Sequence, residues 1–221
     1  MKKRTTMLAL LLATGAGTCL QAQEKLTQFK VRDAITVRTP IMNDSINPKG
    51  EKYADKDLLK TPVVLDLADA PFQVLSTDTA GVLSFPKAEK DHSIYLLETS
   101  LRAERFMTGK LKVTSPARWE IFINGESKMS KENAEDSISG ASTREVNLRL
   151  EPEADYEITI KLLSGSKDKA VPTLKCELIK DDKFKDITCF VSPEQKKRFA
   201  LPNTVYGNRV IGVSISPDGK Y

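Results

Sequence analysis

Apolar and polar side chains alternate along most of the chain, and this alternation predicts β-strands. In residues 146–150 and 156–162 every second side chain is apolar, as in a strand with one buried and one solvated face. Turn-forming Gly, Pro, Asn and Asp residues separate such segments. The expected strands are residues 63–67, 72–76, 81–85, 93–98, 105–114, 118–124, 144–150, 155–163, 173–180 and 187–191. Short strands at this spacing predict an all-β fold, a jelly-roll-like β-sandwich.

Residues 106–129 form the centre of the predicted sandwich. They are expected to make two strands joined by a Ser-Pro corner, and the second strand turns back through Asn124-Gly125. This dipeptide tolerates the positive φ angles of a type I′ hairpin. Outside the strands, the one helical candidate is the short stretch from Pro193 to Phe199.

The first 22 residues have the pattern of an export signal. Met1-Lys2-Lys3-Arg4 is basic, and the apolar run that follows, residues 7–16, is shorter than the ~20 residues of a membrane-spanning helix. Cleavage is expected after residue 22. We therefore expect a periplasmic or secreted protein without a membrane span once the signal is removed.

Three further segments follow from changes in pattern along the chain. Residues 23–61 are an extended, mostly polar lead-in with one short strand expected at residues 29–37. Within it, residues 39–61 have little periodicity and would become ordered only by docking onto another part of the molecule. Residues 62–200 hold the predicted sandwich. Residues 201–221 contain one strand followed by Ser216-Pro217-Asp218-Gly219, a sequence that favours a type I turn.

The net charge of the mature chain does not point to a strongly anionic partner. The 34 lysines and arginines include three in residues 1–22, so the mature chain has 31 basic and 30 acidic side chains. A nearly neutral chain with interspersed charges gives no reason to expect nucleic acid or an anionic membrane as a partner.

Two of the three cysteines, Cys176 and Cys189, lie beyond the signal. If residues 175–180 and 184–190 form a hairpin, the two cysteines face each other, and a disulfide is geometrically allowed and compatible with export. The alternative is that both are buried as small apolar thiols.

No group of residues predicts catalysis or a cofactor. His92 is the one histidine and is expected to be a solvated loop residue, and no second histidine completes a zinc site. Acidic clusters at residues 132–136 and 66–69 lack the spacing of a calcium loop and are expected to be exposed loop charge. No glycine-rich phosphate loop occurs.

The aromatic side chains offer a binding role instead. Trp119 has the parity of the apolar residues around it and is expected in the core. Phe122 has the opposite parity, so it would make an exposed contact or be covered by residues 39–61. Tyr95 is a second candidate for an exposed contact. An exposed ring could stack on the apolar face of a sugar.

Several of these stretches resemble one known family. Residues 21–23, 40–45 and 106–125, together with the closing Ser216-Pro217-Asp218-Gly219-Lys220, are similar to the N-terminal part of exported prolyl oligopeptidase and dipeptidyl peptidase-type serine peptidases of Bacteroidota-like bacteria. The closing motif resembles the blades of TolB-like β-propellers. The resemblance implies that residues 201–221 are the first strand of a truncated propeller, and that the family's catalytic residues lie in a hydrolase domain without a counterpart here.

Two functions are therefore expected. The first is a non-catalytic accessory part of such a peptidase, whose partners are the propeller and hydrolase domains of the same polypeptide. The second is an independent, exported glycan-binding or adhesin-like sandwich module, with a peptide or a glycan as its ligand.

Overall fold

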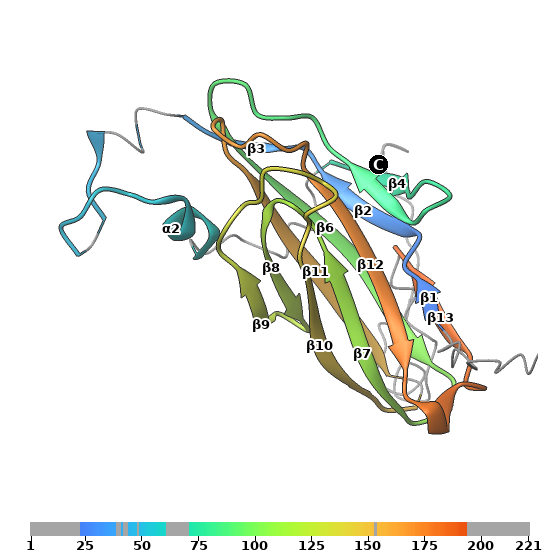
Figure 1. The fold of residues 1–221 in the computed structure, drawn as a ribbon. Coiled ribbons are helices and arrows are strands. Elements are labelled where there is room, and N and C mark those ends of the chain that lie inside the picture. The colour runs from blue at the N-terminus through green and yellow to red at the C-terminus, as the bar shows by residue number, and fades with distance from the viewer. Residues whose placement is uncertain are drawn as a thin grey trace, which may run out of the picture.

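The chain folds into two antiparallel sheets that pack face to face (Figure 1). The computed structural model describes residues 23–38, 41, 44–47, 49–60, 71–152 and 154–193. Sheet A contains β1 (Gln23–Lys25), β5 (Val82–Ser84), β7 (Met107–Thr114), β10 (Thr143–Leu150) and β12 (Thr173–Lys180). Sheet B contains β2 (Gln28–Arg32), β3 (Ile35–Val37), β4 (Phe72–Ser76), β6 (His92–Ala103), β8 (Arg118–Ile123), β9 (Glu126–Lys131), β11 (Asp155–Ser164) and β13 (Cys189–Ser192).

The predicted all-β sandwich is confirmed. Sheet A has the order β1-β12-β7-β10, and β5 pairs with β12. Sheet B has the order β4-β2-β6-β11-β8-β9, and both β3 and β13 pair with β6. The described part also contains α2 (Asp55–Lys60) and the 3₁₀ turn η1 (Asp182–Phe184). None of its helices has the length and apolar character that a membrane crossing requires.

The N-terminal lead-in belongs to the sandwich rather than preceding it. β1 pairs with β12 in sheet A, whereas β2 and β3 pair with β6 in sheet B. The expected single strand at residues 29–37 is thus two short strands. Helix α2, which the polar composition of residues 39–61 concealed, lies against β8 and β11.

The core lies between the two sheets and follows the alternation of the strands. Side chains at every second position of β7, β10 and β12 face those of β6, β8 and β11, and the central ones are 0% exposed. Trp119 is among them, as its parity predicted. The cluster includes Leu97, Leu101, Met107, Leu111, Val113, Trp119, Ile121, Leu150, Ile158, Ile160, Leu162 and Leu178.

The Ser-Pro corner carries the chain from one sheet to the other. β7 and β8 are adjacent in sequence, yet β7 lies in sheet A and β8 in sheet B. The buried ammonium group of Lys131 stabilises this crossing, since it donates hydrogen bonds to the carbonyls of Ser115 (2.6 Å) and Ala117 (3.3 Å) and pairs with Glu135 (2.8 Å). A buried charge needs such partners, and here the corner supplies them.

The predicted hairpin turn is confirmed. Asn124 and Gly125 have φ angles of 51° and 78°, and they connect β8 to β9 with Ile123 facing Glu126. β9 continues from this turn to Lys131.

Several predictions fall on residues outside the described part of the chain. They are the signal peptide at residues 1–22, the strand at residues 63–67, the helix at residues 193–199 beyond its first residue, and the propeller start at residues 201–221.

Replacing Trp119 by alanine is expected to destabilise the protein by about 3–5 kcal/mol, because the indole ring fills the space between the sheets and is fully buried. Urea unfolding monitored by circular dichroism measures this change. Phe122→Ala on the opposite, half-buried face of β8 is the control and should cost less. Equal urea midpoints for wild type and Trp119→Ala would contradict a role of the indole in core packing.

Replacing Gly109 by alanine is expected to destabilise sheet A by roughly 1–3 kcal/mol, as overpacked sites do. A Cβ atom at this position would lie 2.5 Å from the carbonyl oxygen of Ile179 on the neighbouring strand β12. Gly140→Ala is the matched control, because its nearest atom is the rotatable hydroxyl of Ser137 at 3.1 Å. Thermal unfolding measures the stability of both variants. If Gly109→Ala lost no more stability than Gly140→Ala, the prediction would be contradicted.

Candidate functional site

The two aromatic side chains proposed from the sequence as exposed contacts behave differently. The prediction for Tyr95 is wrong: its ring points into the core, is 7% exposed and packs on Phe85 with ring centroids 4.7 Å apart. Its hydroxyl donates to the carbonyl of Pro86 at 3.0 Å. Phe122 is half-buried on the outer face of sheet B, where Thr159 of β11 lies beside it.

The two cysteines are free thiols in different sheets. The hairpin that was expected to pair them does not form, because β13 turns away from β12 and pairs with β6. Cys189 Sγ instead lies 3.2 Å from the sulfur of Met107. Burial raises the pKa of Cys189 to about 11 and raises the pKa of Cys176 as well. Neither is therefore a thiolate nucleophile at neutral pH.

His92 is not the solvated loop residue that the sequence suggested. It begins β6, is 8% exposed, and its Nε2 lies 3.0 Å from Asp55 of α2. Arg118 bridges the same carboxylate at 2.6 Å and Asp168 at 2.8 Å. Asp168 in turn accepts a hydrogen bond from the Gly165 amide at 2.7 Å. The cluster joins α2 to sheet B through these contacts, while His92 Nδ1 and Arg118 Nε are buried without a hydrogen-bond partner among the described residues.

A buried lysine holds the other end of α2. Lys161 of β11 is 1% exposed and donates hydrogen bonds to the carbonyls of Leu58 (3.0 Å) and Leu59. An ammonium group at the last turn of a helix satisfies carbonyls that have no partner within the helix. The side chains of Leu58 and Leu59 pack with Ile94 and Leu163 on the outer face of sheet B. Helix α2 is thus ordered by docking onto sheet B, as predicted for this segment.

The acidic cluster at residues 132–136 is divided among separate ion pairs. Glu132 pairs with Lys60 (2.5 Å) and Asp136 with Lys169 (2.6 Å), while Glu135 pairs with the lysine at the corner. The described residues include no group of three or more His, Cys, Asp or Glu side chains arranged to hold a metal ion. The second acidic cluster, at residues 66–69, lies outside the described part of the chain.

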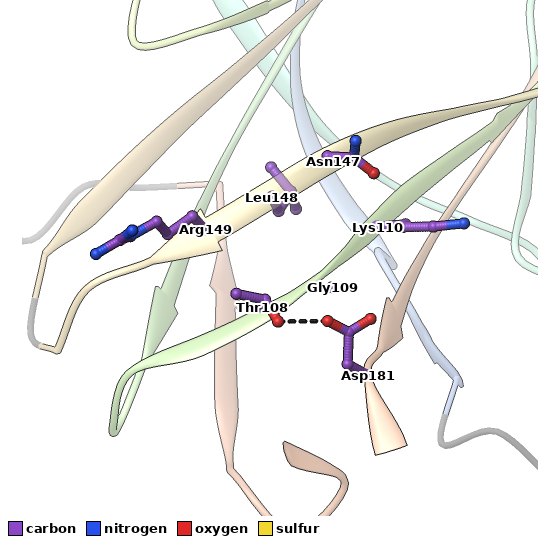
Figure 2. Close-up of a pocket in the computed structure, with 7 residues that line it drawn as sticks. All are labelled: Thr108, Gly109, Lys110, Asn147, Leu148, Arg149 and Asp181. Carbon is purple, nitrogen blue, oxygen red and sulfur yellow. Dashed lines mark hydrogen bonds between the residues drawn. The ribbon is translucent and has the colours of Figure 1, made fainter. Parts of the chain in front are cut away.

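A shallow depression on the outer face of sheet A is the strongest candidate for a binding site (Figure 2). Its volume is about 390 Å³. β7, β10 and the residue after β12 supply its lining, which consists of Thr108, Gly109, Lys110, Asn147, Leu148, Arg149 and Asp181. We call it the β7–β10 depression. Strand register brings these residues together, since Lys110 faces Asn147 and Thr108 faces Arg149 across the two strands.

The polar groups of the depression point outward and are only loosely paired. Thr108 donates a hydrogen bond to Asp181, as Figure 2 shows. Lys110 pairs with Glu145 at 2.9 Å, which raises the pKa of the lysine. Arg149 pairs with Glu151 at 3.0 Å in an exposed contact. Exposed pairs of this kind contribute little to stability.

Aromatic rings lie at one end of the β7–β10 depression. The guanidinium of Arg149 stacks over the ring of Phe106 at 5.2 Å. Phe106 meets Phe184 of η1 edge to face, with centroids 5.8 Å apart. The depression thus combines polar groups with a half-buried apolar border.

The chemistry of the depression suits binding rather than catalysis. Asp181 only accepts hydrogen bonds, Lys110 and Arg149 only donate them, and the amide of Asn147 does both. The seven lining residues include one carboxylate and no histidine or cysteine. Glycoside hydrolysis ordinarily uses a pair of carboxylates, and this lining supplies one.

Sequence reasoning missed this depression because its members occupy the solvated positions of ordinary strands. Alternation identified residues 108, 110, 147 and 149 as outward-facing. It could not show that β7 lies between β10 and β12, which is what places Asp181 beside Thr108.

Comparisons with known proteins find loose structural likenesses only. No family model matches the chain, and no curated protein matches it. A β-glucosidase from Kluyveromyces marxianus in complex with glucose has a TM-score of 0.39 at 16% identity, over 53% of this chain and 14% of its own. The PA14 sugar-binding domain of an RTX adhesin has a TM-score of 0.31 at 18% identity, over 45% of this chain and 51% of its own.

A GH31 α-xylosidase from Xanthomonas citri has a TM-score of 0.39 at 9% identity, over 77% of this chain and 17% of its own. The chain spans about half or less of the length of each of these three structures.

The stability of the protein is expected to increase between pH 8 and pH 10.5 through Lys161. Burial lowers the pKa of this lysine from 10.5 to about 8, so in that window the unfolded chain binds a proton that the folded protein does not. Stability then rises with pH, and the contribution is lost as pH falls to about 8.

Urea unfolding at a series of pH values tests this expectation. In Lys161→Met the part of the increase that belongs to the buried amine should vanish. Lys169→Met, which removes an exposed ammonium group, should keep it. Equal slopes for Lys161→Met and wild type would show that Lys161 is not the titrating group.

Proposed function

We propose that the chain is an exported glycan-binding β-sandwich module, and that the β7–β10 depression is its binding site. The observation that carries the proposal is the set of outward-facing donors and acceptors gathered there, formed by Thr108, Lys110, Asn147, Arg149 and Asp181. A sugar presents hydroxyl groups that both donate and accept hydrogen bonds. Adjacent carboxylate, amide and cationic groups match several hydroxyls of one ring at once.

The shape and the border of the depression support the same ligand class. An open volume of about 390 Å³ on a sheet face admits one or a few sugar rings from the side. Phe106, beneath Arg149, offers apolar surface of the kind on which sugar C–H groups pack. Charge within the lining is mixed, with two cations and one carboxylate, so a neutral or weakly acidic glycan fits better than a polyanion.

The accessory role in a peptidase stays a prediction. It depends on the motif at residues 216–220, which lies outside the described part of the chain. A glycan-binding module is compatible with attachment to a larger protein, so the two ideas do not exclude each other.

Binding is tested by applying the purified chain to an array of neutral and acidic oligosaccharides, with titration calorimetry for each ligand found. Asp181→Ala is expected to weaken binding by about tenfold, because it removes an acceptor and leaves the Thr108 hydroxyl without its partner. Asn147→Ala should have a similar effect.

Glu89→Ala provides the matched control, since it removes an exposed acid from a loop outside the depression. It should bind like wild type. An array without any ligand, or a ligand bound equally by all three variants, would refute the assignment of this site.

A further inference from the structure

Among the described residues, strand β10 ends sheet A with an open edge. β7 is its one strand partner in the part of the chain that the structure describes. Beside that edge lies a second depression of about 340 Å³, which we call the edge groove. Residues 147–149 of β10 form one side of the groove, and Ile123, Asn124, Glu126 and Lys128 of the β8–β9 hairpin form the other, together with Tyr156. Backbone groups at an open edge can pair with another strand.

We infer that the open edge of β10 pairs with the same edge of a second copy of this chain, in an antiparallel register centred on Asn147. A two-fold axis perpendicular to the sheet keeps outer faces on the outside and inner faces on the inside. Residues that face each other across the axis must then both be odd-numbered or both be even-numbered. This restricts the pairing to registers that are centred on one residue, and excludes those centred between two residues.

The charges on the outer face of β10 select among these registers. In the register centred on Asn147, Glu145 faces the second copy's Arg149, and Arg149 faces the second copy's Glu145. Oppositely charged residues that face each other across antiparallel strands attract. The two-fold axis makes this attraction occur twice, with the two Asn147 amides facing each other between the charged pairs.

The neighbouring registers lack this match. Centring the pair on Glu145 places that carboxylate against its own copy, and centring it on Leu148 places Glu145 against Glu151. Centring it on Val146 places Glu145 against Asn147, without an opposite charge. Like charges that face each other directly are destabilising. Of the four central registers, one alone joins opposite charges.

The inner face of β10 agrees with the same register. Val146 then faces the second copy's Leu148, and both side chains are apolar and 6% exposed. They would extend the core of the sandwich across the axis toward the edge groove, whose wall includes Ile123. On the outer face, the present partners of Glu145 and Arg149 are exposed lysine and glutamate side chains. Exchange of such exposed ion pairs costs little.

The expected assembly is a dimer with one continuous sheet A. Its two β7–β10 depressions face the same side, close to the axis. Asn147 and Arg149 belong to both the β7–β10 depression and the pairing edge, so the pairing is measured in the absence of any glycan. A dimer can then be found or lost whether or not the depression binds a sugar.

Sedimentation of the full chain over a wide range of concentration tests the pairing through charge reversal. Wild type should form a dimer. Glu145→Arg and Arg149→Glu should each weaken it by about tenfold or more, because each variant places like charges opposite each other at two positions. The double variant carrying both reversals should dimerise like wild type, since it restores the opposite charges.

Mixing the two single variants gives the sharpest result. Glu145→Arg presents two cations and Arg149→Glu two anions, so an equimolar mixture should form a heterodimer although each variant alone is monomeric. Lys183→Glu on η1 is the control for a reversal away from the edge and should leave the dimer unchanged. A monomeric wild type overturns the proposal and leaves the edge to a strand of another protein. A dimer that none of the reversals weakens would also overturn it.

Discussion

The alternation of inward and outward side chains along the central strands is the constraint on which this structure depends. Because successive residues point to opposite faces, the run that buries Leu111 and Val113 in the core also presents Lys110 on the outer face. A slip of one residue would exchange the two sets. The core and the β7–β10 depression are therefore two consequences of one register, which Gly109 helps to hold by allowing close approach of β12.

Alternation also explains how much of the structure could be predicted from the sequence. It located most strands, the inward position of Trp119 and the all-β class, because each depends on neighbours in the chain. It failed for Tyr95, whose ring lies on the inner face of a strand buried on both sides, where polarity no longer distinguishes the faces. It failed for the cysteines because pairing between distant strands is decided by sheet order. The β7–β10 depression was missed for the same reason.

Buried charged side chains make contacts between segments that the alternation of apolar and polar residues does not predict. Lys131 at the corner, Lys161 under α2 and Arg118 beside it each occupy a strand position that would ordinarily be apolar or exposed. Lys161 and Arg118 satisfy carbonyls or carboxylates from segments far away in sequence, and Lys131 satisfies the carbonyls of the nearby Ser-Pro corner. In low-dielectric surroundings such bonds are specific, because an ammonium group without its acceptors would be costly. These three residues thus fix the places where irregular segments meet the regular sheets.

The pairing of β1 with β12 has a consequence for the order in which the molecule assembles. Glu24 meets Lys180, 156 residues later in the chain, so β1 can find its place only after β12 has been synthesised. Folds with such distant contacts form slowly. The chain would therefore leave the ribosome with β1 still unpaired, and closure of sheet A would be among the last events of folding.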